Sequence, residues 1–157
     1  QRRRVLGRAW RTIGRSCLAE LDLIAPGRSD EHVRLAKKAA HTLLDGPHEA
    51  SQALSTNLLD SILRASFTNS ERTAVTGQKN RLQMKDHPIR AAIVLGAIWS
   101  AHAHYRTENG DKVPWRFSRH ASVHGASSRQ YTRINAVIAL MHVTALLRLI
   151  ETDFADR

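Results

Sequence analysis

The chain has 157 residues and carries 24 Lys and Arg against 14 Asp and Glu, which gives a formal net charge of +10 at pH 7. This length suits a single domain, and a hydrophobic content of 42% is enough to build a buried core. Arg, His or Asp interrupts the longest apolar stretches, so we expect no transmembrane helix and no membrane partner. The lone cysteine, Cys17, excludes an internal disulfide framework and a Cys-rich zinc module.

The first residues lead into an amphipathic pattern rather than the apolar core of a signal peptide, so a cytoplasmic location is expected. The sequence begins with Gln rather than Met, which is compatible with a piece of a longer chain. Arg accounts for 19 of the 24 basic residues, and its planar guanidinium pairs well with phosphate. The composition therefore favours a polyanionic partner, with nucleic acid first and an acidic membrane surface second.

The first predicted helix has one apolar and one basic face. Its apolar residues recur at intervals of three and four, as on one side of a helix: Leu6, Trp10, Ile13, Cys17, Leu21 and Ile24. Arg4, Arg8, Arg11 and Arg15 fall on the opposite side, either as a solvated face or as phosphate contacts. Pro26-Gly27 ends the helix, and the place of Cys17 on the apolar side predicts an inert buried thiol.

Two further helices follow, and Gly46-Pro47 separates them. One begins at Ser29 or Asp30 and runs to about Leu44. The other runs from 48 to 67 with a predicted inner side of Ala50, Leu54, Leu58, Ile62 and Ala65. The next stretch, 68–87, is polar and contains few large apolar residues, so we expect a functional or mobile loop there.

The remaining chain predicts two long helices and one short element. Residues 89–103, which follow Pro88 and a possible cap at Asp86, are apolar on nearly every side and predict a central buried helix. A short element covers 115–124, and a long helix runs from about 129 to 152, with His142 as a core histidine. The whole chain, 1–157, is thus expected to form a single all-α bundle of about five long helices and one short one.

Basic and imidazole side chains are most concentrated between residues 102 and 133, around the sequence Arg119-His120-Ala121-Ser122-Val123-His124-Gly125. An Arg, a polar neighbour and a His five positions after the Arg, on a small helical bundle, resemble the R-x(4–6)-H motif of the HEPN superfamily. Arg119 matches the motif Arg, His120 the polar neighbour and His124 the motif His. The resemblance covers this motif and the helical pattern of roughly the last 70 residues.

The resemblance implies metal-independent endoribonuclease activity without a cofactor, as in toxins and antiviral defence effectors. In such a reaction an imidazole can remove the proton from the 2′-OH or protonate the leaving 5′ oxygen, while a guanidinium stabilises charge on the phosphate. Arg119 and His124 would then be catalytic, and His120 would assist. Neighbouring arginines are the expected RNA-binding residues: Arg106, Arg116, Arg129 and Arg133.

The expected partners follow from the same motif. Residues five apart on an unbroken helix diverge by about 140°, so Arg119 and His124 converge only where the helix ends or where two copies meet. HEPN proteins commonly dimerise across this motif, and we therefore expect a homodimer. An antitoxin or a larger defence complex is a further expected partner.

Two alternatives use the same residues. His120 and His124 have the i, i+4 spacing of paired metal ligands, to which His102 and His104 would add, although no acidic residue stands beside them. The other alternative is a non-catalytic helical module that binds nucleic acid or assembles a larger complex. The aromatic residues Trp99, Trp115, Phe117 and Phe154 are scattered singly, which predicts packing rather than a stacking platform for bases.

Overall fold

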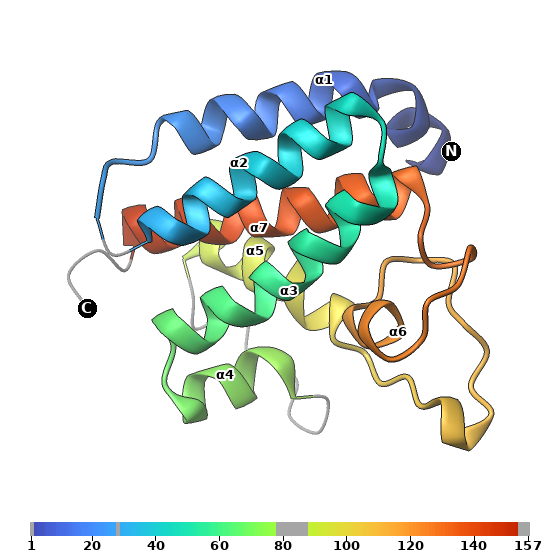
Figure 1. Ribbon diagram of the computed structural model, residues 1–157. Helices are drawn as coiled ribbons and strands as arrows, with labels where there is room; N and C mark the ends of the chain where they lie inside the picture. The colour runs from blue at the N-terminus through green and yellow to red at the C-terminus, as the bar shows by residue number, and fades with distance from the viewer. Residues whose placement is uncertain (1, 28, 78–87, 154–157) are drawn as a thin grey trace.

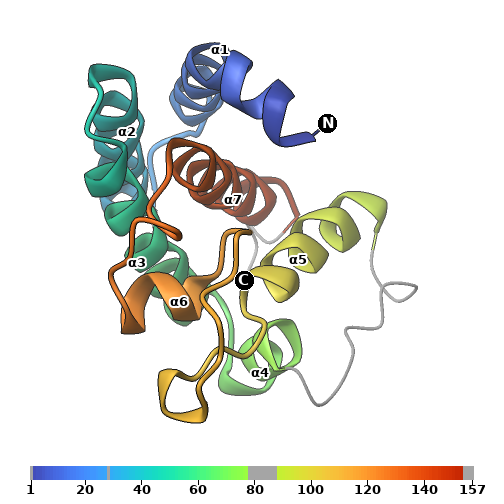
Figure 2. The same ribbon diagram turned by 90° about the vertical axis from the view of Figure 1, so that its right-hand side faces the viewer.

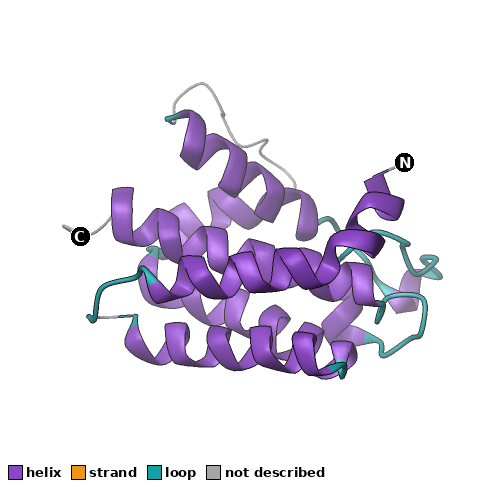
Figure 3. Ribbon diagram, turned by 90° about the horizontal axis from the view of Figure 1, so that it is seen from above, coloured by secondary structure: helices purple, strands orange, loops and turns teal. Residues whose placement is uncertain are grey.

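The computed structural model describes residues 2–27, 29–77 and 88–153. Within these ranges the chain forms seven α-helices and no β-strand, which confirms the predicted all-α fold (Figures 1 and 3). A 3₁₀ turn covers Thr107–Asn109. The helices are α1 (Arg2–Asp22), α2 (Asp30–Asp45), α3 (His48–Ser66), α4 (Asn69–Thr76), α5 (Ile89–Ala101), α6 (Arg119–His124) and α7 (Arg133–Asp153).

The helix α7 lies at the centre of the bundle and contacts α1, α2, α3 and α5. Figure 2 shows α7 nearly end-on, with α1, α2 and α3 around one side of it and α5 on the other. The small helices α4 and α6 lie below this group, and α4 packs on α5 while α6 packs on α3. The fold thus surrounds one apolar helix with four others.

The helix boundaries in the first half of the chain agree with the breaks in the sequence. α1 ends shortly before Pro26-Gly27, and Gly46, with a φ of 122°, ends α2 and donates its backbone N–H to the Leu43 carbonyl. Cys17 and Leu21 of α1 are buried, and Cys17 packs with α2 and α7. The apolar face predicted for the first helix is therefore confirmed.

The inner face of α3 differs from the one predicted. Ala50 and Ala65 are exposed, so both were wrongly placed on the inner side. The first half of the helix instead buries the polar side chains of Ser51, Gln52, Ser55 and Thr56. Two of them hydrogen-bond to other parts of the fold: Ser51 donates to the Ala39 carbonyl at 2.8 Å, and Gln52 donates to the Ser122 hydroxyl at 3.0 Å. Hydrophobic periodicity misses a buried face of this kind.

The polar stretch predicted as a loop contains the helix α4. Thr68 and Glu71 form a capping box, in which each side chain bonds to the backbone N–H of the other residue. Val75 is the buried apolar residue that fixes α4 to the core. The loop prediction was therefore wrong for residues 69–76, and 78–87, with the cap at Asp86, lies outside the described residues.

The predicted central helix, α5, lies at the surface of the bundle. One face is buried against α7 and α4, but Ile89 and Ile93 on the other are 80% and 66% exposed. The central position belongs to α7, where ten of 21 residues are buried. α7 is also long and apolar enough to span a membrane, contrary to the expectation of no such segment, and a buried core helix has the same composition.

Candidate functional site

The motif residues lie on α6, a helix of only six residues that needs support from the rest of the fold. Its first turn is capped by Ser118, whose hydroxyl accepts a hydrogen bond from the Ala121 N–H at 3.2 Å. It ends at His124, immediately before Gly125. The predicted short element therefore begins only at 119, and 115–118 is irregular.

Gln130 fixes the segment in front of α6. Its side-chain oxygen accepts from the Ser118 N–H at 3.0 Å, and its amide nitrogen donates to the carbonyls of Pro114 and Arg116, both at 3.1 Å. Gln130 is fully buried, and its bond to the Ser118 N–H is shielded from water. We call this arrangement the Gln130 clasp. The last helix starts at 133 rather than at the predicted 129, because residues 128–130, which include Gln130, form a turn.

Helices α3 and α7 hold the clasp in turn. Gln52 on α3 donates to the Ser122 hydroxyl at 3.0 Å and to the Gln130 carbonyl at 3.2 Å. Asn135 on α7 donates to the same carbonyl at 2.7 Å, and the Tyr131 hydroxyl donates to the Ser122 carbonyl at 2.7 Å. The place of α6 is thus set by buried polar contacts from residues far apart in sequence.

Four imidazoles gather around this helix, and His120 stands in their middle. The rings of His102, His104 and His124 each lie 6.1 Å from the His120 ring, measured between centroids. The rings of His104 and His124 are stacked with it, whereas that of His102 meets it edge-on. We call these four residues the histidine cluster. His104 and His124 are exposed, while His102 is buried.

Asp60 on α3 binds the motif arginine, and sequence reasoning missed this residue. Arg119 Nε donates to Asp60 Oδ1 at 3.0 Å, and Arg119 Nη2 contacts the second carboxylate oxygen, so the pair is bidentate. The two side chains are only 17% and 21% exposed. The remaining edge of the guanidinium faces the cluster, with Nη1 3.5 Å from His120 Nδ1. Arg119 is therefore fixed in place by Asp60, with its Nη1 edge turned toward His120.

Asp60 also contacts the cluster through His102. His102 Nδ1 donates to the Ile98 carbonyl at 2.8 Å, and its Nε2 lies 3.5 Å from Asp60 Oδ1. The Nε2 atom is buried and has no hydrogen-bond partner among the described residues, so its contact with Asp60 is a close approach rather than a hydrogen bond. Partial burial opposes the charge on Asp60, but the contacts with His102 and Arg119 outweigh it and lower the pKa of the carboxyl.

His120 is held in its neutral form. Partial burial and the positive charge of Arg119 lower the pKa of His120 to about 4, and the three other histidines act in the same direction. At neutral pH the ring therefore carries one N–H and one free lone pair. Such a ring can orient a neighbouring group or hydrogen-bond a phosphate, but it is a weak proton acceptor.

A small polar pocket of about 230 Å³ opens beside the cluster. It is lined by His104, Lys112, Arg116 and the α6 cap Ser118, with Asp111 as its acidic residue. Arg106 lies on the same loop, where its backbone N–H donates to Asp111 at 2.8 Å. Of the predicted RNA-binding residues, Arg106 and Arg116 therefore lie on the side of the histidine cluster.

Arg129 and Arg133 belong to a different surface. The Arg129 guanidinium lies 4.2 Å from the centroid of the Trp115 ring, and that of Arg133 lies 4.9 Å from the Trp10 ring. Phe117 is buried as predicted, but Trp115 is 60% exposed, so the expectation that it serves packing was wrong. The predicted RNA-binding set thus divides between two places.

The alternative of a metal site gains no geometric support. Within 2–27, 29–77 and 88–153, no group of three or more His, Cys, Asp or Glu side chains is arranged to hold a metal ion. In the histidine cluster the rings that flank His120 are stacked on it, whereas ligands of one ion direct their nitrogens at a common point.

His142, predicted to be a hydrogen-bonded core histidine, is half-buried on α7 with its ring 5.6 Å from that of Phe117. Its Nδ1 is buried without a hydrogen-bond partner. Burial and the nearby His102 lower the pKa of His142 to about 4. The folded state therefore binds fewer protons than the unfolded chain between pH 4 and 6.5.

Acidification through this window should destabilise the protein. Because the unfolded chain takes up the proton first, His142 alone removes about 2 kcal/mol from the free energy of unfolding between pH 7 and pH 5. His120 acts in the same direction. Urea unfolding at the two pH values measures the loss, and His142→Gln should reduce it. An equal unfolding midpoint at both pH values would contradict a neutral His142.

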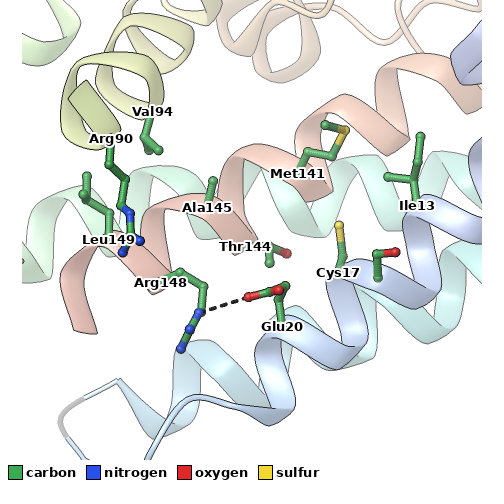
Figure 4. Close-up of a pocket in the computed structure, with 11 residues that line it drawn as sticks. Ile13, Cys17, Glu20, Arg90, Val94, Met141, Thr144, Ala145, Arg148 and Leu149 are labelled. Carbon is green, nitrogen blue, oxygen red and sulfur yellow. Dashed lines mark ion pairs between the residues drawn. The ribbon is translucent and has the colours of Figure 1, made fainter. Parts of the chain in front are cut away.

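A larger hollow of about 450 Å³ lies between α1 and α5, with α7 as its floor (Figure 4). Its lining is mainly apolar and includes Met141 and Val94, and an ion pair between Glu20 and Arg148 at 3.2 Å crosses it. Cys17 faces this hollow, and burial raises the pKa of its thiol. The prediction of an unreactive cysteine agrees with this environment.

Comparison of the chain with protein-family models, with curated proteins and with solved structures finds no match.

Proposed function

We propose that the protein is a metal-independent endoribonuclease of the HEPN type, with its active site at the histidine cluster. The observation that carries the proposal is the Arg119 guanidinium, which Asp60 orients toward His120, the ring on which His104 and His124 are stacked. A fixed guanidinium beside exposed imidazoles provides charge stabilisation and proton transfer, the two functions that RNA cleavage by the 2′-OH requires.

Each residue has a distinct role in this reaction. His124, exposed at the end of α6, removes the proton from the ribose 2′-OH. The 2′ oxygen attacks the phosphorus, and the bond to the 5′ oxygen breaks, leaving a 2′,3′-cyclic phosphate and a 5′-OH. Arg119 stabilises the charge on the phosphate through its free edge. Neutral His120 lies between the two residues and orients them on the phosphate.

The second proton transfer, to the leaving 5′ oxygen, needs another imidazole. His104 is exposed, stacks with His120 from a different part of the chain, and lines the same pocket as Arg116. A homodimer in which two copies face each other across α6 supplies a further His124 and remains part of the proposal. Arg106 and Arg116 would bind the RNA backbone on this side.

The test is cleavage of single-stranded RNA by the purified protein in the presence of EDTA. We expect fragments with 2′,3′-cyclic phosphate and 5′-OH ends, and no cleavage of DNA of the same sequence, because DNA lacks the attacking hydroxyl. Expression in growing cells should slow growth if the protein is a toxin or defence effector. Cleavage that requires a divalent cation, or that leaves 5′-phosphate ends, would contradict the proposal.

A non-catalytic module that binds nucleic acid is the second candidate, and the bidentate pairing of Arg119 with Asp60 favours it, because this pairing neutralises much of the guanidinium charge. Such a module should bind RNA with an affinity that falls steeply with salt, by about one unit of the log–log slope for each neutralised phosphate. Binding without cleavage would select this candidate. Weak salt dependence would count against nucleic acid as the partner.

A further inference from the structure

We propose that Trp115 and the arginines around it form a binding surface for single-stranded RNA, on which Trp115 stacks with an unpaired base. This inference rests on RNA as the ligand of the proposed function and specifies its single-stranded form. The surface comprises Trp115 with Arg129, Trp10 with Arg11 and Arg133, and Arg3 of α1. We call it the tryptophan–arginine surface.

The exposure of Trp115 is the first observation. The residue is 60% exposed, although a side chain with so large an apolar area is normally covered. Arg129 lies over the ring at 4.2 Å and orients it by a cation–π contact. Much of the ring remains open to solvent. A flat, oriented and exposed aromatic ring beside a guanidinium is the arrangement that stacks with a base and pairs with its phosphate.

The second observation is that the N-terminal end of α1 contacts the loop before α6, which carries Trp115. The Arg3 guanidinium donates to the carbonyl of Trp115, which brings the N-terminal turn of α1 against the residue that stacks. Trp10 follows on α1, and the guanidiniums of Arg11 and Arg133 lie 4.7 and 4.9 Å from its ring. Two tryptophans and four arginines from α1, the loop before α6, the loop after it and α7 therefore belong to one region.

The charge of this region points to a polyanion. The first acidic residue in the sequence is Glu20, so the first five turns of α1 contain arginines and no carboxylate. Arg4, Arg8, Arg11 and Arg15 are all exposed. They extend the positive surface along α1 from the end where Arg3 contacts Trp115.

The Gln130 clasp connects this surface to the proposed active site. Gln130 follows Arg129 directly, and it binds the carbonyls on either side of Trp115 as well as the backbone N–H that begins α6. Trp115 precedes Arg119 by four residues, so their Cα atoms are at most about 14 Å apart. One strand of RNA can therefore occupy both places, since even small single-strand binding sites span about four nucleotides.

Stacking selects single strands because a duplex hides the faces of its bases.

The test uses a fluorescent 12-nucleotide 2′-O-methyl adenosine strand, which cannot be cleaved, so binding is measured independently of catalysis. Anisotropy titrations compare the protein with Trp115→Ala and Trp115→Phe. We expect Trp115→Ala to weaken binding about 5- to 150-fold, the range for loss of one stacked base, and Trp115→Phe to retain most of the affinity. Arg34→Ala, at an exposed position on α2, is the matched control and should change the affinity less than about twofold.

Three results would overturn this inference. The first is that Trp115→Ala binds the strand as tightly as the unmodified protein, and the second is that an abasic strand of the same length binds equally well. The third is that Trp115→Ala weakens binding to vesicles of anionic phospholipid but not binding to the strand. Failure of the ribonuclease proposal is distinguishable from failure of this inference. If Trp115→Ala weakens binding of the 2′-O-methyl strand but ordinary RNA is not cleaved, the result supports the surface and contradicts catalysis. Cleavage together with unchanged binding by Trp115→Ala contradicts the surface alone.

Discussion

Replacing His124 by Ala should reduce RNA cleavage at least 100-fold, because general acid–base catalysis by a positioned imidazole contributes about 10²- to 10⁴-fold to a rate. The side chain is exposed at the end of α6, so its loss should leave the fold intact. Binding of the uncleavable strand should also persist, since the arginines and Trp115 are unchanged. Cleavage rates at saturating RNA, measured with EDTA, separate the loss of chemistry from a loss of binding.

The matched control is His41→Ala, which removes an exposed imidazole from α2 on a different helix from the cluster. It should cleave RNA at the rate of the unmodified protein. The assignment of His124 would be wrong if His124→Ala cleaved RNA as fast as His41→Ala in the same preparation, with both variants giving the helical circular dichroism of the parent.

Asp60→Asn should lower both stability and cleavage, because it leaves the Arg119 guanidinium and the His102 ring without their carboxylate. Breaking a buried ion pair from one side costs about 3–5 kcal/mol, and the residual exposure of these side chains places the expected loss near 2 kcal/mol. Cleavage should fall about 100-fold, as a displacement of Arg119 by about 1 Å is enough to cost that much. Urea unfolding and single-turnover cleavage measure the two effects.

Asp45→Asn removes an exposed carboxylate at the end of α2 and serves as the control, with an expected change below about 0.5 kcal/mol. The double variant Asp60→Asn with Arg119→Gln isolates the pair. If Asp60 acts by holding Arg119, adding Asp60→Asn to Arg119→Gln should reduce cleavage little further. Additive losses of activity would show that Asp60 acts independently of Arg119.

The sequence predicted the helices best where strong local signals mark their ends. Pro26-Gly27 and Gly46-Pro47 placed the boundaries of the first three helices, since Pro and Gly at these positions interrupt a helix in any tertiary context. The helix α4 carries an equally local signal, the pair Thr68 and Glu71, which was available in the sequence. It was missed because hydrophobic periodicity is weak in a short helix with one buried valine.

The contacts that build the candidate site could not be predicted in this way, because they join distant parts of the chain. Asp60 and Arg119 are 59 residues apart, and Gln52 meets Ser122 across 70 residues. The reversed roles of α5 and α7 have a similar cause. Both are apolar, and only the packing of the other helices decides which one is surrounded. The clustering of His102 and His104 with His120 likewise depends on where α5 ends relative to α6.

The Gln130 side chain makes its shortest contacts with main-chain atoms of the segment before α6, so the amino acids of that segment can be exchanged without loss of the clasp. The side chains of Pro114 and Arg116 are thereby free to vary, whereas Gln130 and the Ser122 hydroxyl that Gln52 binds on α6 are not. A distant relative that binds a different nucleic acid would then keep Gln52, Gln130 and Asn135 after its arginines, tryptophans and histidines had changed. We therefore expect these three amides to be retained in such a relative more often than the short motif on α6.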